Sequence, residues 1–302
     1  MKLAKSTVGY WCDDIVEGRY LGQGITAAVL DTGIILHPDF DRRIVEFEDF
    51  VNHKKEIYDD SGHGTHVAGI LGGSGMLSGG TYAGMAPQVK LIIAKVLDKE
   101  GNGSVTAVLN GIEWIMKLAQ RQKIHIVNIS VGTHPGLDIE EERKLIRGVE
   151  LLWDMGITVV VSAGNYGPQE RTVAAPGSSR KVITVGAADM SERSGVGEGR
   201  WDYSGRGPTD GCVVKPDLVA PGTYITSCNG KYINRWKRPY TEKSGTSMAT
   251  PIVSGAIACL FSKYQDMTNV EVKLRLRESC VSCNKGGSGW GMLNMKSLME
   301  GK

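Results

Sequence analysis

The stretch Ser244-Gly245-Thr246-Ser247-Met248-Ala249-Thr250-Pro251 places a hydroxyl between a glycine and the start of an apolar run. Gly245 allows a tight turn before Ser247, and Pro251 suits the first turn of a helix, where an N–H has no acceptor. The apolar residues that follow predict a buried helix. Free amides and the helix dipole at its N-terminus would favour negative charge beside Ser247. Taken alone, the stretch fits either a nucleophile or an ordinary capped core helix.

Two other stretches favour the interpretation of Ser247 as a nucleophile over that of an ordinary helix cap. An apolar run of strand type, residues 25–30, delivers Asp31 to its C-terminal end, where open parallel sheets build their sites. Residues 62–70, Gly-His-Gly-Thr-His-Val-Ala-Gly-Ile, put His63 at the mouth of a small-residue helix. A lone aspartate at a strand end is more often a cap, and a lone histidine is more often structural. Together with Ser247, however, they form the order Asp, His, Ser.

These motifs resemble those of the subtilisin-like serine proteases, the subtilase family, in which the triad has the same order. The resemblance runs from about Ile25 to about Leu298 and includes the framework signature Lys-Pro-Asp-Leu-Val-Ala-Pro-Gly at residues 215–222. It implies a three-layer α/β/α fold with a mostly parallel central sheet. It also implies a serine endopeptidase that forms an acyl-enzyme intermediate, with broad specificity and an apolar preference at P1, the substrate residue before the cleaved bond.

The resemblance gives the site residues their roles. Asp31 would hold the imidazole of His63 in the correct tautomer, and His63 would take the proton of Ser247. Asn165 would bind the oxyanion together with the Ser247 amide. The substrate would pair as an added strand between two backbone segments. These segments are Gly101, Asn102 and Gly103 on one side and Ser130, Val131 and Gly132 on the other.

The P1 pocket would be walled by Ser162, Ala163 and Gly164, with Ala174 at its floor. Many family members have glycine where this chain has Ala174. The extra methyl would make the pocket shallower, so Leu, Met or Phe should fit better than Trp or Tyr. The peptide bond between Ala175 and Pro176 falls where the family often has a cis bond.

A second histidine raises the question of a metal. His66 follows His63 by three residues, on the same helix face, and with Asp59 and Asp60 it could suggest zinc. The helical metalloprotease pattern, however, needs a glutamate directly after the first histidine and a second histidine four residues on. The chain meets neither condition. We therefore expect His66 to be structural and the site to contain no metal ligand.

Many secreted subtilases bind calcium between a loop that follows the histidine helix and an aspartate near the start of the domain. Asp39 matches that aspartate, but residues 72–84 contain no Asn, Asp or Glu. Since calcium prefers about six to eight oxygen ligands, we expect none here, with Asp39 acting as a turn or helix-start residue. No cofactor is expected to be required, although a weak calcium or monovalent-cation site near Gly177 and Val182 stays open.

The length of 302 residues and an apolar content of 41% fit one α/β domain, with residues 1–22 as an arm and 23–302 as the catalytic core. Strands at 89–96, 125–130 and 157–161 alternate with helices that Ser104 and Asp138 would cap, which predicts stacked βαβ units. The net charge is only +2, without a basic cluster, which argues against nucleic acid. Peptides or proteins are the expected partners, and the oligomeric state stays open.

Nothing in the sequence predicts a membrane span or a secretory signal. The six cysteines are expected to be reduced, because a chain of this size does not need disulfide bonds for stability. These features predict a cytoplasmic protein that resembles the intracellular branch of the family, with a trimmed secreted form as the alternative. Two other functions stay open: a pseudoprotease that has lost its chemistry, and a processing protease dedicated to one precursor.

Overall fold

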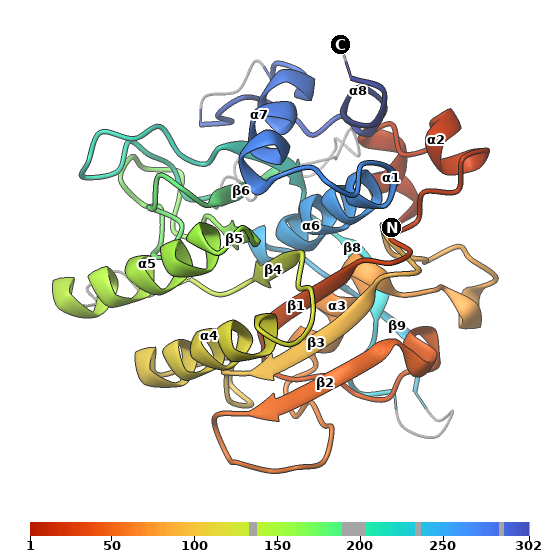
Figure 1. Ribbon diagram of the computed structural model, residues 1–302, viewed down its shortest axis with the longest axis horizontal. Coiled ribbons are helices and arrows are strands. Elements are labelled where there is room, and N and C mark those ends of the chain that lie inside the picture. Colours follow the sequence, from red (N-terminus) through yellow and green to blue (C-terminus); the bar gives the residue numbers. More distant parts are fainter. Residues whose placement is uncertain (133–137, 189–202, 233–236, 284–286, 302) are drawn as a thin grey trace, which may run out of the picture.

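A seven-stranded parallel sheet forms the centre of the computed structural model, which describes residues 1–132, 138–188, 203–232, 237–283 and 287–301 (Figure 1). The strand order is β2-β3-β1-β4-β5-β6-β7. Since both faces of the sheet are covered, its inner strands are almost continuously apolar, as in Thr-Val-Val-Val-Ser of β5. The strands are β1 (Thr26–Asp31), β2 (Ile44–Asp49), β3 (Lys90–Lys95), β4 (Ile126–Ile129), β5 (Thr158–Ser162), β6 (Ile183–Ala188) and β7 (Leu218–Pro221).

Helices cover both faces of this sheet. Leu30 and Asp31 are consecutive in β1, so their side chains point to opposite faces. A Cβ added to Gly111 of α4 (Val105–Ala119) would lie 3.7 Å from Leu30, whereas one added to Gly64 of α3 (His63–Gly72) would lie 3.1 Å from the Asp31 Cβ. Helix α5 (Ile139–Asp154) packs on α4, and α6 (Thr246–Lys263) packs on α3. The three-layer α/β/α fold is thereby confirmed.

The predicted βαβ units are confirmed, with each strand end shifted by one residue. The Ser104 hydroxyl accepts a hydrogen bond from the Ala107 N–H (3.0 Å) and begins α4. The Asp138 carboxylate accepts one from the Glu140 N–H (3.1 Å) and begins α5. In both cases the capping side chain satisfies an amide that has no acceptor within the helix.

The expectation that Pro251 lies in the first helical turn is wrong. Helix α6 begins at Thr246, which makes Pro251 its sixth residue. An N–H at this position would have bonded the carbonyl of Ser247, four residues earlier. That carbonyl instead accepts a hydrogen bond from the Ser130 hydroxyl (3.1 Å). The proline thus leaves a backbone acceptor free, and Ser130, the residue after β4, uses it to hold the start of α6.

The first 22 residues form two short helices, α1 (Lys2–Thr7) and α2 (Asp13–Val16), that pack against the core. Val8 is fully buried, and the Tyr10 hydroxyl donates to the Met85 carbonyl (2.7 Å). The remaining elements are the antiparallel pair β8 (Ile225–Cys228) and β9 (Tyr240–Lys243), the helices α7 (Asn269–Ser279) and α8 (Met295–Glu300), and the 3₁₀ helices η1 (Pro38–Arg43) and η2 (Met76–Ser78).

All six cysteines are unpaired, in agreement with the expectation of free thiols. Among the described residues, no helix is long and apolar enough to cross a membrane.

Candidate active site

The topology gathers the predicted residues at one edge of the sheet. Strand β1 lies between β3 and β4, and the chain builds outward from it in both directions. The carboxyl ends of parallel strands leave a crevice at such a switch point. Asp31 is the last residue of β1, Ser130 follows β4, and Ser162 ends β5. Three strands therefore deliver site residues to the same edge.

The closest contact at this edge joins Asp31 and His63. His63 Nδ1 lies 2.6 Å from Asp31 Oδ1, with the aspartate fully buried and the histidine side chain 25% exposed. Because a carboxylate accepts, Nδ1 carries the proton, and the Nε2 lone pair of neutral His63 is free for a substrate reaction. Burial alone would lower the pKa of His63. The charge of Asp31 and its hydrogen bond outweigh burial, so the pKa lies above its usual value.

A network that the sequence analysis missed holds this pair in place. Asp59 Oδ1 accepts from the Thr32 hydroxyl (2.8 Å), and Asp59 Oδ2 accepts from the hydroxyl (2.6 Å) and the N–H (2.9 Å) of Thr65. The Thr32 hydroxyl in turn accepts from the Gly64 N–H (2.9 Å). These bonds fasten the first turn of α3 to the end of β1. An aspartate just before a helix start was the available signal, and it was weighed only as a zinc ligand.

Ser247 lies in the first turn of α6, close to β4. Its hydroxyl donates to the Ser130 carbonyl (2.9 Å) and makes no hydrogen bond to His63. The serine must therefore rotate about its Cα–Cβ bond before His63 can take the proton. Catalytic hydrogen bonds commonly tighten only when substrate is bound, so this arrangement is compatible with the predicted roles.

The side-chain amide of Asn165 and the backbone nitrogen of Ser247 both lie beside Gly245. Asn165 Oδ1 accepts from both the N–H and the hydroxyl of Thr246 (3.0 Å each), which identifies its other atom, Nδ2, as the outward donor. A Cβ added to Gly245 would lie 3.5 Å from this Nδ2 and 3.7 Å from the Ser247 nitrogen. Gly245 has φ +150°, a conformation open essentially to glycine alone. The glycine thus leaves space beside both nitrogens.

The model of the subtilase family, Peptidase S8, matches residues 22–291 of this chain. The chain belongs to the subtilase family. It is 43% identical to serine protease AprX of Bacillus subtilis over 85% of its own length and 61% of AprX. It is 32% identical to subtilisin DY of Bacillus licheniformis, over 95% of each. Among solved structures it resembles a cold-adapted subtilisin-like serine proteinase, with 30% identity, a TM-score of 0.72 and coverage of 91% and 90%.

In this subtilase the two predicted substrate segments face each other across a cavity. The cavity measures about 120 Å³, and its walls include both of these segments. Its lining is mostly apolar and consists of Gly101, Asn102, Gly103, Val105, Val108, Ile129, Val131, Gly132, Leu145, Ala175 and Pro176. Ser130, which the cavity does not include, is buried and linked to Ser247.

The predicted P1 region centres on Ala174. A Cβ added to Gly132 would lie 2.9 Å from the Ala174 methyl, and one added to Gly164 would lie 2.8 Å from it. The methyl therefore occupies the space between these two backbones. Ala174 also donates its N–H to the Ala163 carbonyl (2.9 Å), which ties it to the end of β5. The Ala175–Pro176 bond is cis, as expected.

His66 has the structural role that the sequence predicted. It is fully buried, and its Nε2 donates to the carbonyls of Ile225 (3.0 Å) and Thr241 (3.2 Å). Although it follows His63 by only three residues, its ring binds β8 and β9 rather than the end of β1. The carboxylates once considered with it have other partners: Asp59 accepts from Thr32 and Thr65, and Asp60 pairs with Lys95 (2.7 Å).

Asp39 lies in the first turn of η1, as expected for a helix-start residue. Its buried carboxylate accepts from the N–H groups of Gly75 (3.0 Å) and Leu77 (3.2 Å). The loop of residues 72–84 therefore presents amide donors to Asp39. A calcium ion would need carbonyl oxygens from the loop at this place.

Proposed function

We propose that this subtilase is a serine endopeptidase that hydrolyses peptide bonds with the triad Asp31, His63 and Ser247, with broad specificity and an apolar P1 preference. The observation that carries the proposal is the 2.6 Å contact between Asp31 and His63 at the edge where α6 presents Ser247. AprX and subtilisin DY, both named as proteases, support it. The chain spans only 61% of AprX, so the substrates of that protein are not transferred.

The proposed reaction begins when the peptide pairs with the segments around Gly101 and Val131. His63 Nε2 takes the Ser247 proton as the oxygen attacks the carbonyl carbon, and Asp31 stabilises the imidazolium that forms. The Asn165 Nδ2 and the Ser247 N–H bind the oxyanion. His63 then gives its proton to the leaving amine, which leaves an ester on Ser247. Water, activated by the same histidine, hydrolyses that ester.

The P1 preference rests on Ala174. Its methyl lies between Gly132 and Gly164, which limits the depth available to a large ring. An unbranched or γ-branched apolar side chain loses little in such a pocket, whereas Trp and Tyr meet the methyl. Pairing through the peptide backbone supplies the remaining affinity and makes recognition broad.

We further propose that residues 1–302 act as one catalytic domain in the cytoplasm, without a required cofactor and without a nucleic-acid or membrane partner. The burial of Val8 and Tyr10 against the core supports a single domain. Six unpaired cysteines support a reducing compartment. Activity that survives extensive dialysis against a chelator would be expected, and loss of activity under these conditions would contradict cofactor independence.

Labelling with a fluorophosphonate probe, followed by peptide mapping, tests the nucleophile. We expect modification at Ser247 in the parent chain and none in Ser247→Ala, with the far-ultraviolet circular dichroism unchanged. An unlabelled but folded parent would identify a pseudoprotease.

A peptide library with varied P1 residues then tests specificity. We expect Leu, Met and Phe to exceed Trp and Tyr, with the gap narrowing in Ala174→Gly. Cleavage of a single sequence would indicate a dedicated processing protease, and a strong preference for Arg would contradict the assigned pocket.

A further inference from the structure

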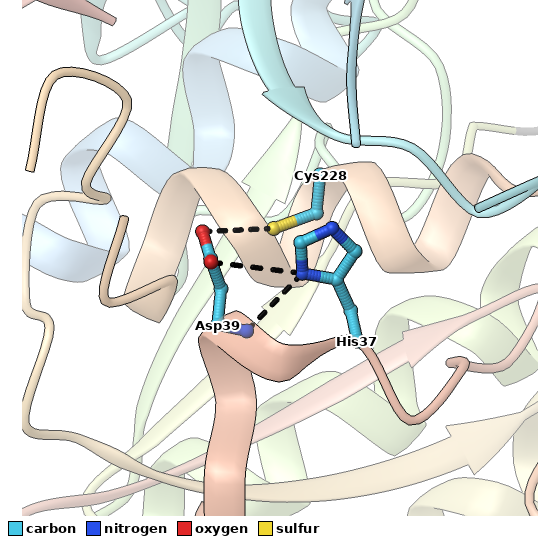
Figure 2. Close-up of side chains that lie close together, drawn as sticks. All are labelled: His37, Asp39 and Cys228. Carbon is cyan, nitrogen blue, oxygen red and sulfur yellow. Dashed lines mark hydrogen bonds and ion pairs between the residues drawn. The ribbon is translucent and has the colours of Figure 1, made fainter. Parts of the chain in front are cut away.

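Three side chains with ligand atoms for a metal meet outside the active site. His37, Asp39 and Cys228 are buried, and one ligand atom from each lies within 4.8 Å of the other two. Figure 2 shows His37 and Asp39 on one segment, with Cys228 approaching from a separate strand, β8. His37 Nδ1 is 3.8 Å from Asp39 Oδ1, and Cys228 Sγ is 3.7 Å from Asp39 Oδ2. The proposed protease chemistry uses none of these groups.

The hydrogen bonds of His37 fix its tautomer. Nε2 lies 2.9 Å from the Pro239 carbonyl, which can only accept, so Nε2 carries a proton. Nδ1 lies 3.2 Å from the Asp39 N–H, which can only donate, so Nδ1 has none. The imidazole is therefore neutral, and the single lone pair of Nδ1 accepts from the Asp39 N–H, a long hydrogen bond that a metal ion would have to replace. A metal-binding histidine commonly donates its other N–H to a backbone carbonyl in this way.

The carboxylate of Asp39 is also held in one orientation. Oδ2 accepts from Gly75 N–H (3.0 Å), the Tyr240 hydroxyl (2.9 Å) and the Cys228 thiol. Oδ1, the oxygen nearer to His37, accepts only from the Leu77 N–H (3.2 Å). Oδ1 therefore keeps acceptor capacity for a further ligand, 3.8 Å from His37 Nδ1. Such fixed supporting contacts are typical of the surroundings of metal ligands.

We propose that His37 Nδ1, Asp39 Oδ1 and Cys228 Sγ form a binding site for a thiophilic divalent metal, with Zn²⁺ as the fitting ion. Imidazole, carboxylate and thiolate are the ligands that zinc takes, at about 2.0–2.3 Å in a tetrahedral arrangement. His37 Nδ1 lies 3.8 Å from Asp39 Oδ1, Cys228 Sγ lies 3.7 Å from the other oxygen of the same carboxylate, and one ligand atom of each residue lies within 4.8 Å of the others. A modest contraction and rotation of the carboxylate would bring all three ligand atoms to one ion. A water molecule would be the fourth ligand, as in other zinc sites with three protein ligands.

Binding changes one proton. The thiol of Cys228 is protonated without metal, since burial and the charge of Asp39 raise its pKa. When the metal–sulfur bond forms, the S–H bond breaks and the proton leaves to solvent. The charges of the divalent metal, the thiolate and the carboxylate then sum to zero. Arg43, which donates to the Asp39 carbonyl oxygen, is the nearby cation that opposes binding. Calcium would be disfavoured, because one carboxylate cannot replace an oxygen shell.

Cobalt titration of the full chain carrying Ser247→Ala, which prevents self-digestion, tests the site. Co²⁺ in place of zinc gives a thiolate-to-metal charge-transfer band in a tetrahedral site. We expect this band to saturate at one equivalent and to vanish in Cys228→Ser. The matched control is Cys259→Ser, which removes a fully buried thiol outside the cluster and should keep the band. Absence of saturable binding, or a band that persists in Cys228→Ser, would overturn the proposal.

Thermal unfolding gives an independent measurement. At free Zn²⁺ about 100-fold above its Kd, the melting temperature should rise by roughly 5 °C. This rise should be lost in His37→Gln, whose amide can still donate to Pro239, so this variant decides the question if Cys228→Ser does not fold. An equal rise in His37→Gln would contradict the site. A rise with Ca²⁺ that requires Asp39 but not Cys228 would also contradict it.

Discussion

Helix α3 carries two histidines that differ in almost every physical respect. At its first residue, His63 is partly exposed and bonded to a carboxylate, and its pKa lies above the usual value. One turn later, His66 is buried and bonded to two backbone carbonyls. Burial, with the nearby charges of Lys243 and His63, lowers its pKa to about 3. The difference shows that the acceptor decides the role. A charged acceptor stabilises the imidazolium that a general base must form, and a carbonyl in the interior does not.

The largest expected effect comes from replacing His63. His63→Ala should reduce peptide hydrolysis by about 10⁶-fold, a size taken from measurements on subtilisin itself. The unfolding free energy should change little, because the side chain is at the surface of the crevice. Turnover of chromogenic peptides and urea unfolding measure the two properties. Substantial hydrolysis by this variant would show that another group is the base.

His66→Ala should do the reverse. It removes a buried ring and leaves the carbonyls of Ile225 and Thr241 without their donor, so we expect a loss of about 2–4 kcal/mol in unfolding free energy. Hydrolysis per folded molecule should largely remain. Urea unfolding and active-site titration with a fluorophosphonate separate the two quantities. A variant as stable as the parent would contradict the structural role assigned to His66.

The contrast also explains which parts of the molecule could be predicted from sequence. Asp31, His63 and Ser247 each lie in a short motif whose neighbours give the local structure, so their placement followed from the chain alone. The link between Ser130 and Ser247 joins residues 117 positions apart, and that between Asp39 and Cys228 spans 189. No local pattern encodes such meetings. They depend on how β4, α6 and β8 pack.

Pro251 illustrates a different limit. A proline is most easily placed in a first helical turn, because that position costs no hydrogen bond. Here the interior position is tolerated because the Ser130 hydroxyl supplies the missing donor to the Ser247 carbonyl. Local propensity therefore gave a helix start that was too late, and a tertiary contact corrected it.

The pH dependence of stability should differ between the two histidines. The folded pKa of His66 is about 3, below the unfolded value of about 6.5, so between these values only the unfolded chain binds this proton. Unfolding free energy should therefore rise with pH across that window, by up to about 1.4 kcal/mol per pH unit from this group. For His63 the raised pKa gives the opposite sign, with stability lost as pH rises above 6.5.

Urea unfolding of the parent and of His66→Ala between pH 4 and 6.5 measures this term. The slope should be smaller in the variant, while carboxylates that titrate in both chains cancel in the difference. Equal slopes would mean that His66 takes a proton in the folded state. In that case the two histidines of α3 would differ less than their hydrogen bonds indicate.

The smallest effect concerns Lys243, the last residue of β9, whose charge lowers the pKa of both histidines. The rate of hydrolysis should rise with pH through the pKa of His63, because only the neutral imidazole accepts the serine proton. Replacing the lysine by Lys243→Met should move this rise to higher pH by less than about 1 unit, since the partly exposed charge is screened. Added salt should reduce the shift.

The matched control is Lys90→Met, which removes an exposed lysine at the start of β3, the far end of the sheet from the site, and should leave the profile unchanged. The readout is kcat/KM from pH 5 to 9. A shift to lower pH, or an equal shift in Lys90→Met, would mean that Lys243 does not act on His63 directly. A shift of the predicted sign would show that one lysine charge reaches both histidines of α3, and that only the histidine paired with a carboxylate titrates where catalysis can use it.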